Sequence, residues 1–178
     1  MWFFCAVMLF LLSASGCDGW FAFTPERVVL QELFSRADNK FSGIDRSSIR
    51  ILRQENWNNE FFVLSYFREA SANNEESDCL MLSRIRKERS RWTTPLVAQV
   101  CNSPGINHEP IRQVENLEGW QDDEEVTVLF GLMQDGESVA IEFEWEDGKA
   151  ERVDLTNGSY LVLREGAHRL EFFRGIEE

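Results

Sequence analysis

The residues of this chain best suited to chemistry are its four cysteines, Cys5, Cys17, Cys79 and Cys101. Cys79 and Cys101 form an even pair downstream of a hydrophobic leader, and such a pair is typical of a disulfide in an exported protein. A disulfide here would stabilise the fold by about 3 kcal/mol in the chain-entropy model. The alternative is two buried thiols, which pack as small apolar groups. The spacing is far from CxxC, so neither redox catalysis nor a zinc knuckle is indicated.

Cys17 ends an apolar N-terminal segment. No charged side chain occurs before Asp18, and residues 2–12 are almost wholly apolar. A bilayer-spanning helix needs about 20 apolar residues, so this segment has the length of a targeting sequence. Its ending, Ala14-Ser15-Gly16-Cys17, resembles the lipobox of bacterial lipoproteins. The resemblance implies cleavage before Cys17, which would become the acylated N-terminus and carry a diacylglyceryl thioether, often with a further N-acyl group.

This resemblance has consequences for location and partners. It implies an extracytoplasmic protein held to a membrane through its N-terminal lipid, at the cell surface or at the periplasmic face of the inner membrane. Asp18 directly after Cys17 resembles the inner-membrane retention signal of some Gram-negative lipoproteins. Cys5 would be lost on cleavage. A plain secretory signal peptide and an uncleaved N-terminal anchor remain the alternatives.

Composition and motifs exclude several classes of function. The chain has 18 basic and 31 acidic residues, giving a net charge of −13, which disfavours a general nucleic-acid partner. No GxGxxG or GxxxxGK[ST] sequence indicates nucleotide binding, and GxSxG and HExxH are absent. The only histidines, His108 and His168, are interpreted as loop and strand-face residues. The acidic run 122–125 lacks EF-hand spacing and is interpreted as a solvated loop. We therefore assign no catalytic residue, metal ligand or cofactor.

Two features are candidates for binding. One is a basic cluster in an otherwise acidic chain, which could meet anionic headgroups or an acidic partner; its members are Arg84, Arg86, Lys87, Arg89 and Arg91. The alternative is that these side chains pair with surplus carboxylates. The other feature is Trp57 in an Asn-rich segment, where an exposed ring could stack on a sugar. The alternative for Trp57 is a place in the hydrophobic core.

The elements before residue 104 predict an α+β unit. Thr24-Pro25-Glu26 is a helix start, and apolar residues then recur at helical spacing as far as Ala37. Strand patterns follow at 47–52, 60–68, 79–86 and 96–101. We expect the helix to pack on an antiparallel meander in which Cys79 and Cys101 lie on neighbouring strands.

The rest of the chain predicts an all-β unit after a linker. Residues 104–120 have the proline and polar content of a linker. Strand patterns at 126–133, 139–145, 150–155, 160–163 and 168–173 are then separated by Asp135-Gly136, Asp147-Gly148, Asn157-Gly158 and Glu165-Gly166. The Asp-Gly and Asn-Gly dipeptides among them are strong hairpin signals. This rhythm resembles the small β-sandwich modules of uncharacterised bacterial surface proteins.

The expected organisation is therefore a signal peptide at 1–16, a tether at 17–23, an α+β domain at 24–103, a linker at 104–120 and an antiparallel β-sandwich-like domain at 121–178. The functional hypothesis is an anchored lipoprotein with a binding or scaffolding role toward an envelope protein or glycan. Two alternatives stay open. One is a cell-envelope hydrolase using a carboxylate pair among the many acidic residues, and the other is an accessory subunit of an envelope assembly.

Overall fold

The computed structural model describes residues 24–39, 42–70, 75–88, 91–93, 96–102, 110–118 and 125–177. This part of the chain is mostly β, with one short helix and several antiparallel sheets. The elements are α2 (Pro25–Ala37), β1 (Ile44–Trp57), β2 (Glu60–Ala70), β3 (Glu76–Glu88), β4 (Arg91–Thr93), β5 (Leu96–Asn102), β6 (Ile111–Glu118), β7 (Glu125–Leu132), β8 (Ser138–Trp145), β9 (Ala150–Asp154), β10 (Ser159–Glu165) and β11 (Leu170–Glu177).

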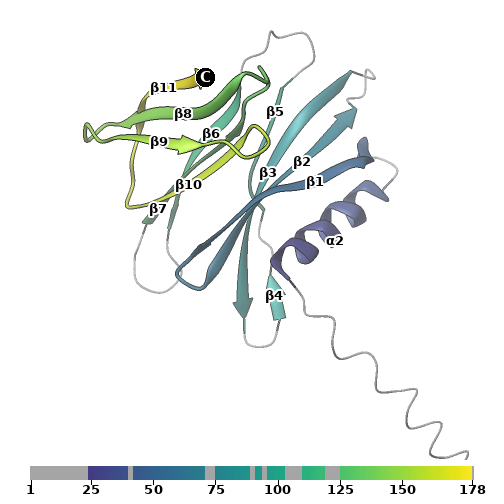
Figure 1. The fold of residues 1–178 in the computed structure, drawn as a ribbon. Helices are drawn as coiled ribbons and strands as arrows, with labels where there is room; N and C mark the ends of the chain where they lie inside the picture. The colour runs from purple at the N-terminus through teal and green to yellow at the C-terminus, as the bar shows by residue number, and fades with distance from the viewer. Residues whose placement is uncertain are drawn as a thin grey trace, which may run out of the picture.

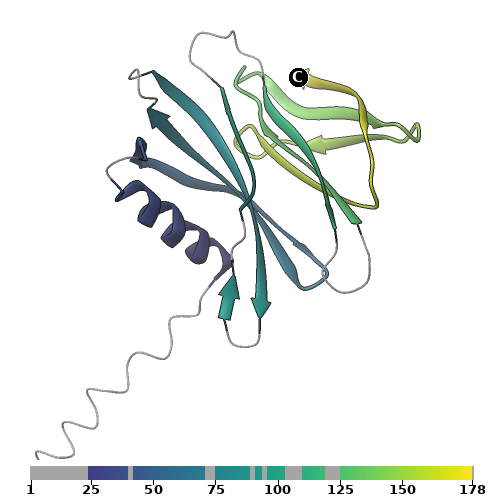
Figure 2. The same cartoon turned by 180° about the vertical axis from the view of Figure 1, so that it is seen from behind.

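The strands form three sheets. In the first, β1, β2 and β3 lie in sequence order, and both β5 and the short β4 pair with β3. The second has the order β10-β7-β6, and the third has the order β11-β8-β9. The helix lies on one side of the first sheet and the other two sheets lie on the opposite side (Figure 1), an arrangement that is also visible from behind (Figure 2).

Three hydrophobic clusters hold these layers together. One lies between α2 and the first sheet, and a second joins the first sheet to the second. The third joins the second sheet to the third. The middle layers are consequently apolar on both faces, as continuous apolar runs predict. In β7, Val128 and Phe130 face the first sheet while Leu129 faces the third. In β2, Phe62 faces the second sheet and Val63 faces the helix.

The helix begins where the sequence predicts, although its cap differs in detail. Pro25 is the first helical residue, and Thr24 before it has an extended backbone. The Thr24 side chain makes no capping hydrogen bond, and its carbonyl oxygen instead accepts from the backbone N–H groups of Arg27 and Val28. Val29 and Leu33 bury the inner face of the helix against the sheet.

The segment expected to be a linker contains a strand. β6 lies within residues 104–120 and pairs antiparallel with β7. Its apolar residues are spaced by three: Ile111 and Leu117 face the first sheet, whereas Val114 faces the third. Because strand side chains alternate between faces, a spacing of three places an apolar residue on each face in turn. Such a strand lacks the period of two that marks a half-buried strand in a sequence.

The four glycine turns of the C-terminal part are present, and they differ in what they join. Asn157-Gly158 closes a short antiparallel bridge between Thr156 and Ser159. Asp147-Gly148 connects β8 to its neighbour β9. The other three turns carry the chain between the second and third sheets. All four glycines have positive φ, as such turns require. The hairpin prediction is therefore wrong for Asp135-Gly136, which joins strands of two different sheets, because backbone geometry reverses the chain without choosing the sheet that the next strand joins.

The hydrophobic core continues across the expected domain boundary. The cluster between the first two sheets contains Leu64 and Leu80 from one side of the boundary, together with Phe130 and Leu161 from the other. Residues 1–23, with the expected signal peptide and tether, lie outside the described residues. Within the described part, no helix has the length and apolar character needed to cross a membrane.

Candidate functional site

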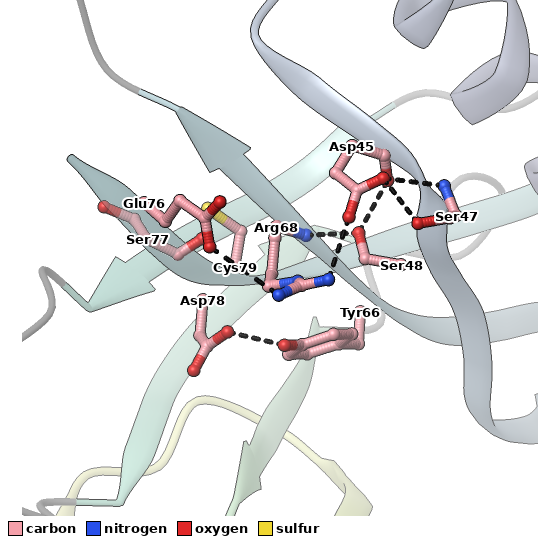
Figure 3. Close-up of polar contacts among 9 residues, drawn as sticks. All are labelled: Asp45, Ser47, Ser48, Tyr66, Arg68, Glu76, Ser77, Asp78 and Cys79. Atoms are coloured by element: carbon pink, nitrogen blue, oxygen red, sulfur yellow. Dashed lines mark hydrogen bonds and ion pairs between the residues drawn. The ribbon is translucent and has the colours of Figure 1, made fainter. Parts of the chain in front are cut away.

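The candidate site begins with a bulge in β1. Asp45 pairs with Arg68 on β2, but the next pair is Arg50 with Tyr66, so β1 contains extra residues between the two pairs. A bulge bends the strand and redirects its side chains, which is why bulges are frequent beside functional sites. Here it turns two serines toward the end of β2. We call the resulting group the bulge cluster, and it consists of Asp45, Ser47, Ser48, Tyr66, Arg68, Glu76 and Asp78 (Figure 3).

Arg68 lies at the centre of the bulge cluster. Its Nη2 contacts Asp45 Oδ2 at 2.9 Å, and its Nη1 contacts Glu76 Oε2 at 3.6 Å. Its backbone N–H donates to Ser48 Oγ at 2.7 Å. The bulge and the end of β3 are therefore tied to one guanidinium group on β2 (Figure 3).

Asp45 is held in its ionised form. The Ser47 hydroxyl donates to Asp45 Oδ1 at 2.7 Å, and the Ser47 backbone N–H donates to the same oxygen at 2.9 Å. These hydrogen bonds, with a smaller contribution from the Arg68 charge, lower the pKa of Asp45 below its usual value. The carboxylate is thus a fixed hydrogen-bond acceptor and an unsuitable general acid.

Tyr66 and Asp78 form the second half of the cluster. The Tyr66 hydroxyl donates to Asp78 Oδ1, and the Arg50 guanidinium lies 4.3 Å from the centre of the Tyr66 ring. Burial raises the pKa of Tyr66 to about 12, and the hydrogen bond to Asp78 adds to the effect. Gln134, beyond β7, donates to Asp78 Oδ2 at 3.4 Å. The cluster therefore lies at one end of the space between the first and second sheets.

The chemistry of this arrangement is recognition by hydrogen bonds and charge. The Arg68 and Asp45 side chains are 43% and 40% exposed, so both can exchange partners with a ligand. Fixed donors and acceptors of both signs suit a partner that also presents both signs. The seven residues of the bulge cluster include no cysteine or histidine that could act as a nucleophile or base at neutral pH, and Cys79, which Figure 3 also draws, is disulfide-bonded.

The disulfide lies at the same end of the first sheet but on its other face. Cys79 and Cys101 are directly paired across β3 and β5 and are joined with an S–S distance of 2.08 Å. This agrees with the expectation that the two cysteines lie on neighbouring strands. Cys79 is fully buried in the cluster beneath the helix, whereas Cys101 is exposed.

Two arginines of the expected basic cluster form a buried ion-pair group. Arg86 Nε lies 2.6 Å from Glu60 Oε1, and Arg84 Nε pairs with the other oxygen of the same carboxylate. The side chain of Glu60 is only 13% exposed. Pairing with carboxylates was the alternative to a binding patch, and for Arg84 and Arg86 the structure contains such pairs.

The other binding candidates are placed as follows. Lys87 is exposed, with its Nζ 5.7 Å from the centre of the Trp92 ring. Arg91 begins β4, and Arg89 lies outside the described residues, as do Cys17 and His108. Trp57 ends β1 and is partly buried against the core between the first two sheets. At least one side of the Trp57 ring therefore packs against the core.

Sequence reasoning missed the bulge cluster, and the reason is its composition. Its members come from three strands, and in each strand they look like ordinary polar residues at the end of an apolar run. The only local signal is the polar run Asp45 to Ser48, which lies at the edge of a predicted strand. Strand pairing and the bulge bring these residues to Arg68, and neither is visible in a short window of sequence.

Comparisons of the chain with protein-family models, with curated proteins and with solved structures found no match. The arguments about function therefore rest on the residues and the geometry.

Proposed function

We propose that the protein is a lipoprotein of the bacterial cell envelope, anchored through Cys17, whose folded part binds an envelope protein through the bulge cluster. The observation that carries the binding part is the half-exposed Arg68 held between two carboxylates at the end of two sheets. The anchoring part is supported by the lipobox-like ending before Cys17. On this proposal the second and third sheets act as the sandwich-like unit that braces the binding end.

A protein partner fits this site better than a glycan. Sugar rings are usually held against an exposed aromatic face, but the Tyr66 ring is nearly buried and has the Arg50 guanidinium over it. Trp57, the other aromatic candidate, packs on the core. Carboxylates and arginines side by side instead suit a polar peptide surface with charges of both signs.

The carboxylate-pair hydrolase gains no support from electrostatics. A general acid in such an enzyme needs a raised pKa. Hydrogen bonds from Ser47 lower the pKa of Asp45, and hydrogen bonds from Ser138 lower that of Asp135. The pKa of Asp147 is also lowered: desolvation opposes the shift, but donation by Lys149 and the charge of Arg164 outweigh it.

The anchoring is tested in the native cell. Membrane fractions of the wild type are compared with Cys17→Ala and with the control Cys5→Ala, whose residue lies in the segment removed by cleavage. We expect Cys17→Ala to lose membrane retention and the lipid mass on the N-terminal peptide, whereas Cys5→Ala keeps both. Unchanged retention of Cys17→Ala, together with an unlipidated wild-type peptide, would refute the lipoprotein proposal.

The binding is tested by cross-linking in intact cells. Arg68→Ala and Asp45→Asn are compared with Arg152→Ala, whose side chain is 58% exposed on β9, away from the cluster. We expect a defined cross-linked species that disappears in the two cluster variants and persists in the control. A species that persists in all three variants excludes the bulge cluster as the binding surface.

A further inference from the structure

Glu69 lies beside the disulfide in an arrangement that the folded chain does not otherwise require. Glu69 is on β2, and its Oε2 lies 3.9 Å from Cys79 Sγ. One carboxylate oxygen and the two sulfurs all lie within 4.8 Å of one another. These groups are on the helix side of the first sheet, opposite the bulge cluster.

The contact between Glu69 and Cys79 lacks a donor while the disulfide is intact. A disulfide sulfur has no proton, and a carboxylate oxygen only accepts hydrogen bonds. The Glu69 carboxylate oxygen and Cys79 Sγ therefore share no hydrogen bond with each other. A thiol proton on Cys79 or a metal ion bound to the sulfurs would make this contact attractive, and either one requires that the disulfide be reduced.

The residues next to Glu69 and the two cysteines counter the negative charge of the carboxylate. The Gln99 amide nitrogen lies 3.3 Å from Glu69 Oε2 and 3.6 Å from Cys101 Sγ. On its other side, Gln99 Oε1 accepts from Arg36 Nη2 at 3.2 Å. Gln99 thus orients the carboxylate and links it to a fixed positive charge on the last turn of α2. Groups of this kind commonly orient and tune metal ligands.

We propose that, after reduction of the disulfide, Cys79, Cys101 and Glu69 bind a thiophilic divalent cation such as Zn²⁺. Thiolates and a carboxylate are ordinary zinc ligands, and a tetrahedral ion would keep its fourth position for water. Two thiolates and one carboxylate carry one negative charge more than a divalent ion neutralises, and the nearby Arg36 guanidinium offsets that charge. Exposure of Cys101 provides access from solvent. This site goes beyond the proposed binding function and does not depend on it.

The chemical steps balance with a dithiol as reductant. The dithiol transfers two electrons and two protons to the disulfide, giving two thiols and an oxidised dithiol. The metal ion then forms bonds to both sulfurs, and the two thiol protons pass to solvent. For the reverse step, an oxidised dithiol takes two electrons from the two thiolates and two protons from solvent, which forms the Cys79–Cys101 bond again and releases the ion, so occupancy follows the redox state.

The test uses Co²⁺ as a spectroscopic probe with the full chain in detergent, carrying Cys5→Ser and Cys17→Ser to remove the other thiols. We expect the reduced protein to bind Co²⁺ with a thiolate charge-transfer band and the visible bands of tetrahedral cobalt, both removed by Zn²⁺. The oxidised protein should show neither. A reduced, folded protein without the thiolate band would overturn the proposal.

Single-residue variants distinguish a metal site formed by the fold from thiols that bind the ion nonspecifically. Cys79→Ser and Cys101→Ser should each abolish the thiolate-cobalt spectrum of the folded site. Glu69→Gln should weaken Zn²⁺ binding by about 10-fold or more. The matched control is Glu171→Gln, an exposed carboxylate on β11, which should bind as the parent does. Circular dichroism checks the fold of each reduced protein. If reduction unfolds the chain, its thiols bind without regard to Glu69, and an affinity unchanged in Glu69→Gln refutes the proposal.

Discussion

The guanidinium group of Arg53 on β1 donates to the carbonyl oxygen of Ser159 on β10, from Nε at 3.3 Å and from Nη2 at 3.1 Å. Nη2 also donates to the carbonyl oxygen of Asp154 at 2.9 Å. β1 is the outer strand of the first sheet, and β10 is an outer strand of the second. Asp154 ends β9, an outer strand of the third sheet, so one side chain of the first sheet binds carbonyl groups at the edges of both other sheets.

Removing this connection should destabilise the fold. We expect Arg53→Ala to lower the free energy of unfolding by about 1.5 kcal/mol, because hydrogen bonds from a charged donor are lost. The Ser159 carbonyl oxygen keeps its hydrogen bond from the Thr156 backbone N–H. Urea denaturation measures the change. Arg152→Ala, which removes an exposed arginine from β9, should alter stability by no more than a few tenths of a kcal/mol. Equal losses in the two variants would exclude a special role for Arg53.

Gly131 should tolerate no side chain. A Cβ built at this position of β7 would lie 2.1 Å from the Tyr160 hydroxyl oxygen and 2.4 Å from the Ile111 carbonyl oxygen. Gly131→Ala should therefore cost about 3 kcal/mol through overpacking. The buried Tyr160 hydroxyl has no hydrogen-bond partner, so Tyr160→Phe alone should be neutral or slightly stabilising. Thermal unfolding of the two single variants and the double variant measures these changes. Tyr160→Phe should recover part of the loss in the double variant, and strict additivity would contradict the contact.

Removing the charge of Glu60 should destabilise the fold more than removing the charge of an exposed carboxylate. Glu60→Gln leaves Arg84 and Arg86 close together without their shared counter-charge. Breaking a buried ion pair from one side costs about 3 kcal/mol or more. Chemical denaturation at neutral pH measures this loss. Glu76→Gln is the control, since its partner Arg68 keeps Asp45. A loss below about 0.5 kcal/mol for Glu60→Gln would mean that the arginines find other counter-charges.

In an alkaline titration, we expect the two tyrosines to lose their protons at higher pH than free phenols do. The chain has only Tyr66 and Tyr160, so phenolate absorbance reports on few groups. The pKa of Tyr66 is raised to about 12, mainly by burial. Its contribution to stability is therefore complete below the unfolded value of about 10 and is lost as pH rises toward 12. Tyr66→Phe should remove this transition. A phenolate signal near pH 10 in the folded wild type would contradict the buried hydroxyl.

The bulge cluster should also lose stability at low pH, through protonation of Asp45. The pKa of Asp45 is lowered in the folded state, first by the Ser47 hydroxyl. Its stabilising effect is thus present above the unfolded pKa and is lost as pH falls through the lower folded value. Asp45→Asn should be less stable than the wild type at neutral pH, and the two should converge in acid. The control Asp154→Asn alters a highly exposed carboxylate and should show a much smaller pH-dependent difference.

Much of the fold follows from local sequence. The helix start at Pro25, the meander before residue 104 and the pairing of Cys79 with Cys101 all agree with the structure. The sequence did not predict β6, because its apolar residues alternate between two hydrophobic clusters. The candidate site was not predictable, since Arg68 and Asp45 meet only through a bulge in paired strands.

What the sequence determines by itself is the local conformation of the backbone and the apolar or polar character of each strand face. A glycine at Gly136, Gly148, Gly158 or Gly166 permits a positive φ whatever surrounds it. The partner of each strand is decided only by tertiary structure. Of these four turns only the one at Gly148 joins two strands of the same sheet, and the others lead from one sheet to another. Strand partners are chosen by hydrophobic burial and hydrogen bonding between distant segments, as in the contact from Arg53 to Ser159. No short stretch of the chain contains that information.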